Sequence, residues 1–214
     1  MRLKEILINV IAISVIVILP HADLIPFFGF SIPILFFVWL LLKYSGETFS
    51  DLGFSFKRFK TNSILIGSLV AVAALSFMQL VFFPVLEYFV TFEEPDVGLY
   101  DFIRENKWQY FFTVVMGWLI GGVYEEIVFH GFIFTRLEKM IQGRYSTQIS
   151  FVLTACIFGA YHVQLGAAGL INALIIGAVY LALFLYFKRN LWYSIICHGV
   201  YNSIVMTLIY HGYL

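Results

Sequence analysis

Long apolar runs alternate with short polar connections along the chain. An α-helix needs about 20 mostly apolar residues to cross the hydrocarbon core of a bilayer, with about 17 as a practical lower limit. Seven runs come near that length, and we expect each to form a transmembrane helix. They span residues 5–20, 26–42, 62–84, 108–134, 148–163, 168–187 and 191–211. The pattern therefore predicts an all-α, polytopic transmembrane helix bundle of about seven spans.

The composition supports this class and narrows the possible partners. Hydrophobic residues make up 61% of the 214 residues and charged residues only 12%, against about 25% charged in soluble domains. The formal net charge is zero, so no basic excess indicates a nucleic-acid partner. Cys156 and Cys197 lie in apolar runs without the spacing of a metal or redox motif, and we interpret them as small apolar side chains. The partner that the composition indicates is the lipid bilayer.

The distribution of positive charge predicts the orientation, because Lys and Arg concentrate in cytoplasmic segments. With the N-terminus in the cytoplasm, 11 of the 13 basic residues fall on the inner side, and only Arg104 and Lys107 fall outside. Residues 1–20 resemble a signal peptide but lack a small-x-small cleavage site, so we expect a retained first span. The polar connections 43–61 and 85–107 are too short for a soluble domain. We therefore expect one membrane domain over residues 1–214.

Two adjacent glutamates stand inside the fourth apolar run. The stretch "VYEEIVFHGFIF" at 123–134 carries Glu125, Glu126 and His130. A charged side chain at the centre of a lone helix costs about 2.5–3.5 kcal/mol on insertion scales, and such groups normally face a bundle interior or a wet cavity. On an α-helix the two glutamates point about 100° apart. We therefore expect one to face a cavity and the other a supporting partner, with Gly121-Gly122 just before them marking a kink or a close helix contact.

Further polar groups that could take part in chemistry lie in the fifth and seventh runs. His162 ends the fifth run, and His198 and Asn202 share one face of the seventh, where both can donate a hydrogen bond toward one point. A single buried His or Asn usually serves as interhelical glue. A buried glutamate pair is harder to explain in that way, because like charges repel in a medium of low dielectric. The pair suits a general base, or a proton or cation relay of the kind that transporters use.

Three segments carry a family resemblance. "EEIVFHG" at 125–131, "FGAYH" at 158–162 and "HGVYN" at 198–202 follow one another on successive polar-bearing spans. They resemble the EExxxR, FxxxH and HxxxN motifs of the CAAX protease and bacteriocin-processing family, also called Abi. The motif-bearing catalytic core would cover residues 108–205, and "DLGF" at 51–54 resembles a short segment that often precedes it.

The resemblance implies an intramembrane endopeptidase that needs no metal or other cofactor. Glu125 with His162 would activate a water, Glu126 would support that site, and His198 and Asn202 would stabilise the oxyanion. The expected substrate is a membrane-associated peptide or protein such as a bacteriocin or pheromone precursor, or a prenylated protein as in the eukaryotic branch. We expect a bacterial plasma-membrane location, and the oligomeric state stays open.

One position departs from the family pattern and keeps alternatives open. His130 stands where the family has arginine, so the ion pair made there is weakened or depends on pH. The chain is then also compatible with a weakly active or inactive member that serves as an immunity or regulatory scaffold. A zinc metalloprotease is a second alternative, since Glu126 and His130 are spaced i, i+4 and His162 and His198 could complete the ligands. A third is a small transporter, although no inverted repeat supports it.

The depths of the site residues do not agree when helices are counted residue by residue. At 1.5 Å per residue, Glu125 lies roughly 16 Å from Arg136, whereas His162 lies roughly 27 Å from Arg144. We therefore expect the fifth helix to be tilted or to start deeper, with "QLGAAG" at 164–169 turning within the protein.

Overall fold

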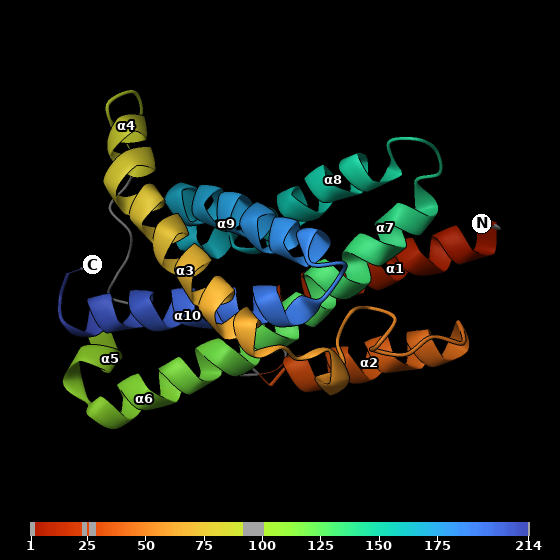
Figure 1. The fold of residues 1–214 in the computed structure, drawn as a ribbon, viewed down its shortest axis with the longest axis horizontal. Helices are drawn as coiled ribbons and strands as arrows, with labels where there is room; N and C mark the ends of the chain where they lie inside the picture. The colour runs from red at the N-terminus through yellow and green to blue at the C-terminus, as the bar shows by residue number, and fades with distance from the viewer. Residues whose placement is uncertain (1–2, 23–24, 26–28, 92–100, 214) are drawn as a thin grey trace.

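A computed structural model describes residues 3–22, 25, 29–91 and 101–213. Every regular element in these ranges is a helix (Figure 1). The elements are α1 (Leu3–Ile18), η1 (Leu19–His21), α2 (Ser31–Tyr44), η2 (Phe56–Arg58), α3 (Thr61–Phe77), η3 (Met78–Phe82), α4 (Phe83–Glu87), α5 (Asp101–Glu105), α6 (Lys107–Met116), η5 (Gly117–Ile133), α7 (Phe134–Met140), α8 (Ser146–Tyr161), η6 (Val163–Leu165), α9 (Gly166–Tyr186) and α10 (Leu191–Tyr210). The all-α prediction is confirmed.

Each of the seven expected spans falls on a helix or on a continuous helical stretch. Five stretches of the described chain are long and apolar enough to cross a membrane: Leu3–His21, Thr61–Glu87, Lys107–Met140, Val163–Tyr186 and Leu191–Tyr210. Ser31–Tyr44 and Ser146–Tyr161 are shorter apolar helices. The chain is therefore an all-α integral membrane protein, and about seven spans remain compatible with it. The start of the second expected span, at 26–28, and the middle of the expected outer connection, at 92–100, lie outside the described residues.

The N-terminus and the C-terminus lie at opposite ends of the bundle (Figure 1). Figure 1 shows the N-terminus and the α7–α8 turn at one end of the long axis, and α4, α5 and the C-terminus at the other. This arrangement agrees with an odd number of crossings. The short helix α5 lies inside the connection 85–107, for which the hydropathy pattern predicts no helix.

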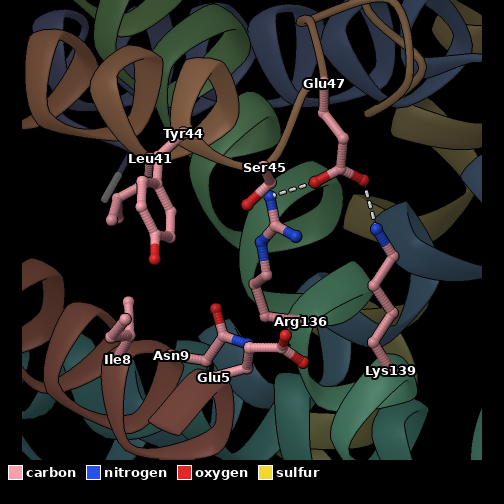
Figure 2. Close-up of a pocket in the computed structure, with 9 residues that line it drawn as sticks. All are labelled: Glu5, Ile8, Asn9, Leu41, Tyr44, Ser45, Glu47, Arg136 and Lys139. Carbon is pink, nitrogen blue, oxygen red and sulfur yellow. Dashed lines mark hydrogen bonds and ion pairs between the residues drawn. The ribbon is translucent and has the colours of Figure 1, made fainter. Parts of the chain in front are cut away.

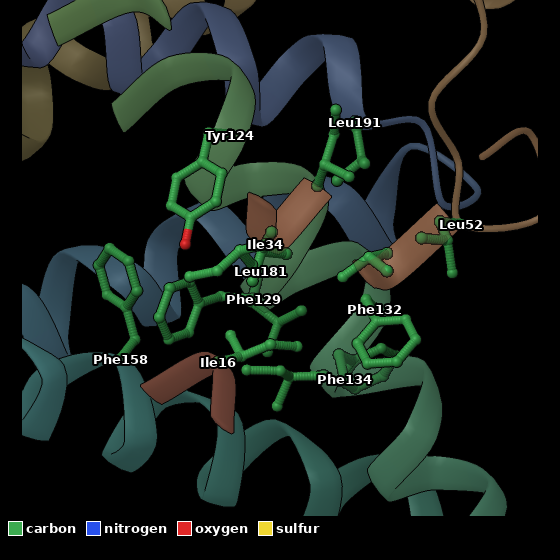
Figure 3. Packing of buried hydrophobic residues seen from close by; sticks show 14 of the residues in the cluster. Ile16, Ile34, Leu52, Tyr124, Phe129, Phe132, Phe134, Phe158, Leu181 and Leu191 are labelled. Atoms are coloured by element: carbon green, nitrogen blue, oxygen red, sulfur yellow. The ribbon is translucent and has the colours of Figure 1, made fainter. Parts of the chain in front are cut away.

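The helix η5 forms the centre of the molecule, and 13 of its 17 residues are buried. It is wound as a π-helix rather than as the expected α-helix, a form that is rare and often found at functional sites. Because η5 is so deeply packed, tertiary contacts rather than local propensity decide its winding. Figure 3 shows its aromatic side chains, Phe129 and Phe132, packed against residues of the N-terminal helices such as Ile16 and Ile34.

The Gly121-Gly122 pair lets η5 and α10 approach closely. A Cβ atom on Gly122 would lie 3.2 Å from the backbone oxygen of Ile195 and 3.6 Å from the Cα of Gly199. Gly199 in turn leaves room for the ring of Trp118. The expected close contact is confirmed, and it brings the glutamate helix against the helix that carries His198.

The "DLGF" segment fastens the α2–α3 connection to the same two helices. Leu52 is fully buried, and a Cβ atom on Gly131 of η5 would lie 3.3 Å from it. The backbone N–H of Leu191, the first residue of α10, donates to the carbonyl of Gly53 at 3.2 Å. Gly53 has φ +94° and its α-carbon faces the carbonyl of Arg189, a position in which a larger residue would collide. The segment thus holds the start of α10 against η5.

Candidate functional site

The expected site residues come from three helices. Glu125 lies in η5, His162 caps the C-terminal end of α8, and His198 and Asn202 lie in α10. The Oε2 atom of Glu125 is 3.9 Å from Nε2 of His162 and 3.8 Å from Nε2 of His198. Both separations exceed a direct hydrogen bond, and one water molecule can bridge a polar gap of this size.

The contact between Glu125 and His162 resolves the depth disagreement. The residue count assumed that Arg136 in α7 and Arg144, just before α8, lie at the same depth. Because Glu125 Oε2 and His162 Nε2 are only 3.9 Å apart, the two arginines must lie at different depths. The turn after His162 is tighter than expected. It occupies residues 162–165, and the glycines of "QLGAAG" already belong to α9, which begins at Gly166 with φ +75°.

Glu126 has a different environment from its neighbour. Its side chain is 0% exposed. The Nδ1 atom of His130 lies 2.8 Å from Glu126 Oε2, and the Nδ1 atom of His198 lies 2.9 Å from Glu126 Oε1. Both carboxylate oxygens are therefore engaged by imidazoles. Of the two glutamates, Glu126 is the one that orients its neighbours, whereas Glu125 makes no contact this short with either histidine beside it.

His198 is fixed on two sides. Its Nδ1 is engaged by Glu126, and its ring stacks on the ring of Tyr180 with centroids 4.4 Å apart and an angle of 21°. These contacts leave Nε2 directed toward Glu125. Tyr180 lies in an apolar run outside the three motifs, so the sequence offered no signal that it supports the site.

His162 is held by its own helix. Its Nδ1–H donates to the backbone carbonyl of Phe158 at 2.8 Å, and its ring lies against the ring of Phe158 at 4.6 Å. Use of Nδ1–H in this bond leaves Nε2 with a lone pair facing Glu125 in the neutral ring. The side chains of His162 and Glu125 are 17% and 10% exposed. The cluster therefore reaches solvent or lipid on their side.

Gly121 lies where the polar groups of α10 meet. A Cβ atom added to Gly121 would collide with Asn202 Nδ2 and lie 2.9 Å from His198 Nε2. Asn202 Nδ2 also makes a long hydrogen bond to the carbonyl of Gly117, at 3.4 Å. Two nitrogen atoms of α10 thus point to one small space beside a glycine. The sequence indicated Gly121 only as a packing residue. Its spacing of four residues from Glu125, which on an α-helix places both on one face, is the signal that could have linked it to the site.

A residue from outside the motif-bearing region also reaches the site. The ring of His21, at the end of η1, packs edge-on against Tyr161 with centroids 5.1 Å apart. Tyr161 directly precedes His162. The N-terminal helix therefore forms part of the surroundings of the site, which hydropathy alone did not indicate.

The zinc alternative predicts a set of metal ligands that includes His130. Within the described ranges, no group of three or more His, Cys, Asp and Glu side chains is arranged to hold a metal ion. His130 is fully buried and faces Glu126 through Nδ1. His130 and Glu126 are thus paired with each other.

A comparison with protein families covers this region. Residues 107–204 match the model described as "Type II CAAX prenyl endopeptidase Rce1-like". This part of the chain is similar to the Rce1-like family. The Rce1-like region runs from α6 into α10 and contains all five of the expected site residues, together with Gly121, His130 and Tyr180. No curated protein and no solved structure matches the chain.

Proposed function

We propose that the chain is an intramembrane endopeptidase that hydrolyses a peptide bond in a membrane-associated peptide or protein. The observation that carries the proposal is the unequal use of two adjacent glutamates. Each carboxylate oxygen of Glu126 is hydrogen-bonded to an imidazole. Glu125 instead faces the Nε2 atoms of His162 and His198 at 3.9 and 3.8 Å. The Rce1-like match supports the same reaction class, because it is a family of proteases.

In the proposed reaction a water molecule lies between Glu125 and His162. The Glu125 carboxylate accepts a proton from this water as its oxygen attacks the carbonyl carbon of the scissile bond, which forms a tetrahedral oxyanion. When the C–N bond breaks, the proton held by Glu125 passes to the leaving nitrogen. The products are a carboxylic acid and an amine, and Glu125 returns to its ionised form.

His198 and Asn202 would stabilise the oxyanion in the space beside Gly121. Donors that are already oriented toward developing charge stabilise a transition state strongly in a site of low dielectric. A donor at His198 Nε2, combined with Nδ1–H bound to Glu126, requires a doubly protonated ring, for which Glu126 is the counter-ion. Glu126 thus has a positioning role toward His198.

His130 can replace the family's arginine in this scheme. Its ring reaches Glu126 at 2.8 Å, so the second contact to that carboxylate is kept, although with a group that can lose its charge. This contact favours an active enzyme over the alternative of an inactive immunity or regulatory scaffold. Bacteriocin and pheromone precursors, and prenylated proteins, are the proposed substrates.

The proposal can be tested with the full chain reconstituted in liposomes. The substrates would be a farnesylated CAAX peptide and a set of unprenylated transmembrane peptides, with products identified by mass spectrometry. We expect cleavage by the wild type and a loss of about 10²–10⁴-fold in Glu125→Gln, which keeps the shape of the side chain. Glu87→Gln, at an exposed position of α4, is the matched control. Equal turnover by Glu125→Gln and wild type would refute the proposed role of Glu125.

A further inference from the structure

A cavity separate from the candidate functional site lies at the N-terminal end of the bundle. It measures about 460 Å³ and is formed by α1, the end of α2 with the following connection, and α7 (Figure 2). None of the proposed catalytic residues lines it. A volume of this size suits a small ligand or the polar head of a lipid.

The cavity has a buried cation with an unused donor. The Arg136 side chain is 5% exposed, its Nη2 lies 2.6 Å from Glu47 Oε2, and its guanidinium lies over the ring of Phe132 at 4.9 Å. Among the described residues, Nε of Arg136 has no hydrogen-bond partner. Figure 2 shows the guanidinium on the wall of the cavity, with Lys139 beside it and bound to Glu47. Buried donors without a partner are rare in folded proteins, so Arg136 points to a ligand that accepts hydrogen bonds.

The cavity also carries the opposite charge. Glu5 and Glu47 line it together with Arg136 and Lys139, so the formal charges of the lining cancel. A simple anion would be repelled by the two carboxylates, and a simple cation by the two basic groups. A ligand with a phosphate and an ammonium group a few ångströms apart satisfies both pairs. The Tyr44 hydroxyl, which points into the cavity in Figure 2, adds a further donor for the phosphate.

The position of the cavity adds an apolar requirement. Ile8 and Leu41 line it beside the charged groups, and Leu3 and Leu7, on the same helix as Ile8, are exposed on the outer surface. The cavity lies where α1 begins, α2 ends and α7 ends, which is the level at which helices leave the hydrocarbon core. A ligand here has its polar head in the cavity and its apolar chains along the helices.

We propose that this cavity binds the headgroup of a zwitterionic phospholipid that carries a phosphate and a primary ammonium group. Arg136, Lys139 and Tyr44 bind the phosphate, and Glu5 binds the ammonium. Because α7 continues directly from η5, the bound lipid connects the membrane surface to the helix that carries Glu125. The site is independent of the proposed peptidase activity.

The test measures lipid retention by native mass spectrometry of the purified full chain. The protein is mixed with equal amounts of phosphatidylethanolamine, phosphatidylcholine and phosphatidylglycerol, and in a separate arm with free phosphoethanolamine. We expect preferential retention of phosphatidylethanolamine, because the choline headgroup lacks N–H donors and the glycerol headgroup leaves a net negative charge. Retention of free phosphoethanolamine by a protein that retains none of the three lipids would identify a soluble phosphate ester as the ligand and overturn the lipid proposal.

The variants decide whether retention depends on this cavity. Lys139→Gln and Tyr44→Phe should each weaken retention, with about a tenfold effect expected for the lost charge. Arg136→Lys keeps the charge but removes Nε, and the other two variants decide the result if it fails to fold. Lys43→Gln is the matched control, since Lys43 lies over the Trp39 ring and does not line the cavity. Equal retention of all three lipids by the wild type, or unchanged retention in Lys139→Gln and Tyr44→Phe, would overturn the proposal.

Discussion

Two groups of carboxylates lie on or near the helical stretch Lys107–Met140, and they differ in their partners. The inner group is Glu125 and Glu126, and the outer group is Glu47 and Glu138. Inside the bundle, Glu126 is bound by His130 and His198. At the end of the stretch, Glu47 pairs with Arg136 and Lys139, and Glu138 pairs with Arg189 at 2.8 Å. The inner group uses imidazoles, which can be neutral, and the outer group uses permanent cations.

The difference follows from the cost of burying charge. A permanent ion pair in a medium of low dielectric loses hydration that its mutual attraction often fails to repay. Histidine avoids this cost in the resting site when it is neutral, and it then still supplies a donor and an acceptor. The proposed reaction needs a charged His198 only while the oxyanion develops beside it. In the outer group Lys139 and Arg189 remain 44% and 42% exposed. Arg136 is only 5% exposed, but it lines a cavity that also holds Glu47, so permanent charge is kept near the surface or beside a polar cavity. We therefore attribute reactivity to the inner group and fastening of the connection and helix ends to the outer group.

The largest expected difference is in cysteine labelling from the two sides of the membrane, which shows on which side the outer group lies. In a Cys156→Ser background, which removes the exposed native thiol, Asp51→Cys and Tyr145→Cys should react with a membrane-impermeant maleimide only from the cytoplasm. Asp96→Cys, in the part of the chain that the structure does not describe, should react only from outside. The reason is the excess of basic residues in the inner segments. Labelling of position 96 from the cytoplasmic side would show that the predicted topology is wrong.

Removal of the charge of Glu125, which faces His162 and His198 at 3.9 and 3.8 Å without a direct hydrogen bond, should have the next largest effect. Glu125→Gln and His162→Ala should each reduce kcat by about 10²–10⁴-fold, because both act on the attacking water. Turnover of the reconstituted enzyme and a thermal unfolding curve of each variant are the measurements. If Glu126→Gln alone abolished turnover and Glu125→Gln did not, the assigned roles of the two glutamates would be reversed.

The space beside Gly121 offers a sharper test with a control on the same helix. A methyl group on Gly121 would collide with Asn202 Nδ2, whereas on Gly117 it would lie 3.4 Å from Asn202 Cβ, an ordinary contact. Gly121→Ala, like Asn202→Ala and His198→Ala, should therefore lower kcat by about 10²–10³-fold, with a smaller change in KM. Gly117→Ala should stay close to wild type. Equal losses in the two glycine variants would mean that helix packing, and not the oxyanion space, is responsible.

The sequence was sufficient for the fold class and for the motif residues, because both depend on local signals. Hydropathy identifies an apolar helix without its neighbours, and the Glu125, His162 and His198 segments carry recognisable spacings. It could not predict the π-helical winding of η5, which depends on packing, or the stacking of Tyr180 on His198, which joins α9 to α10. The approach of His21 to Tyr161 and the meeting of Arg136 with Glu47 also join residues far apart in sequence. A single sequence contains no periodic signal for such contacts.

His130 separates the hydrolytic mechanism from the zinc alternative. In our scheme His130→Ala removes one of two donors to Glu126 and leaves His198 bound, so turnover should fall less than in Glu125→Gln. Chelators should leave the wild type unchanged. The zinc alternative expects the reverse, because loss of one of four ligands dismantles a zinc site. Metal analysis of active protein decides: stoichiometric zinc that disappears together with turnover in His130→Ala would support the metalloenzyme.

The smallest expected effect is a pH dependence of stability that arises in the outer group. Burial opposes ionisation of Glu47, but hydrogen bonds from Lys139 and Arg136 outweigh it and hold the pKa of Glu47 below its ordinary value of 4.5. The folded state thus binds this proton more weakly than the unfolded state. The stabilisation is therefore fully present above the ordinary pKa and is lost as the pH falls through the lowered folded value.

Thermal unfolding of the purified protein between about pH 3 and pH 7 measures this contribution, since the range brackets the ordinary pKa of a glutamate. The wild type should lose stability on acidification more steeply than Glu47→Gln, which cannot titrate at this position. The difference in Tm between the two proteins should be largest near neutral pH and should shrink below the ordinary pKa. Glu87→Gln, on the exposed surface of α4, should follow the wild-type curve throughout. A Tm difference between wild type and Glu47→Gln that stayed constant with pH would mean that Glu47 contributes through its shape rather than through its charge.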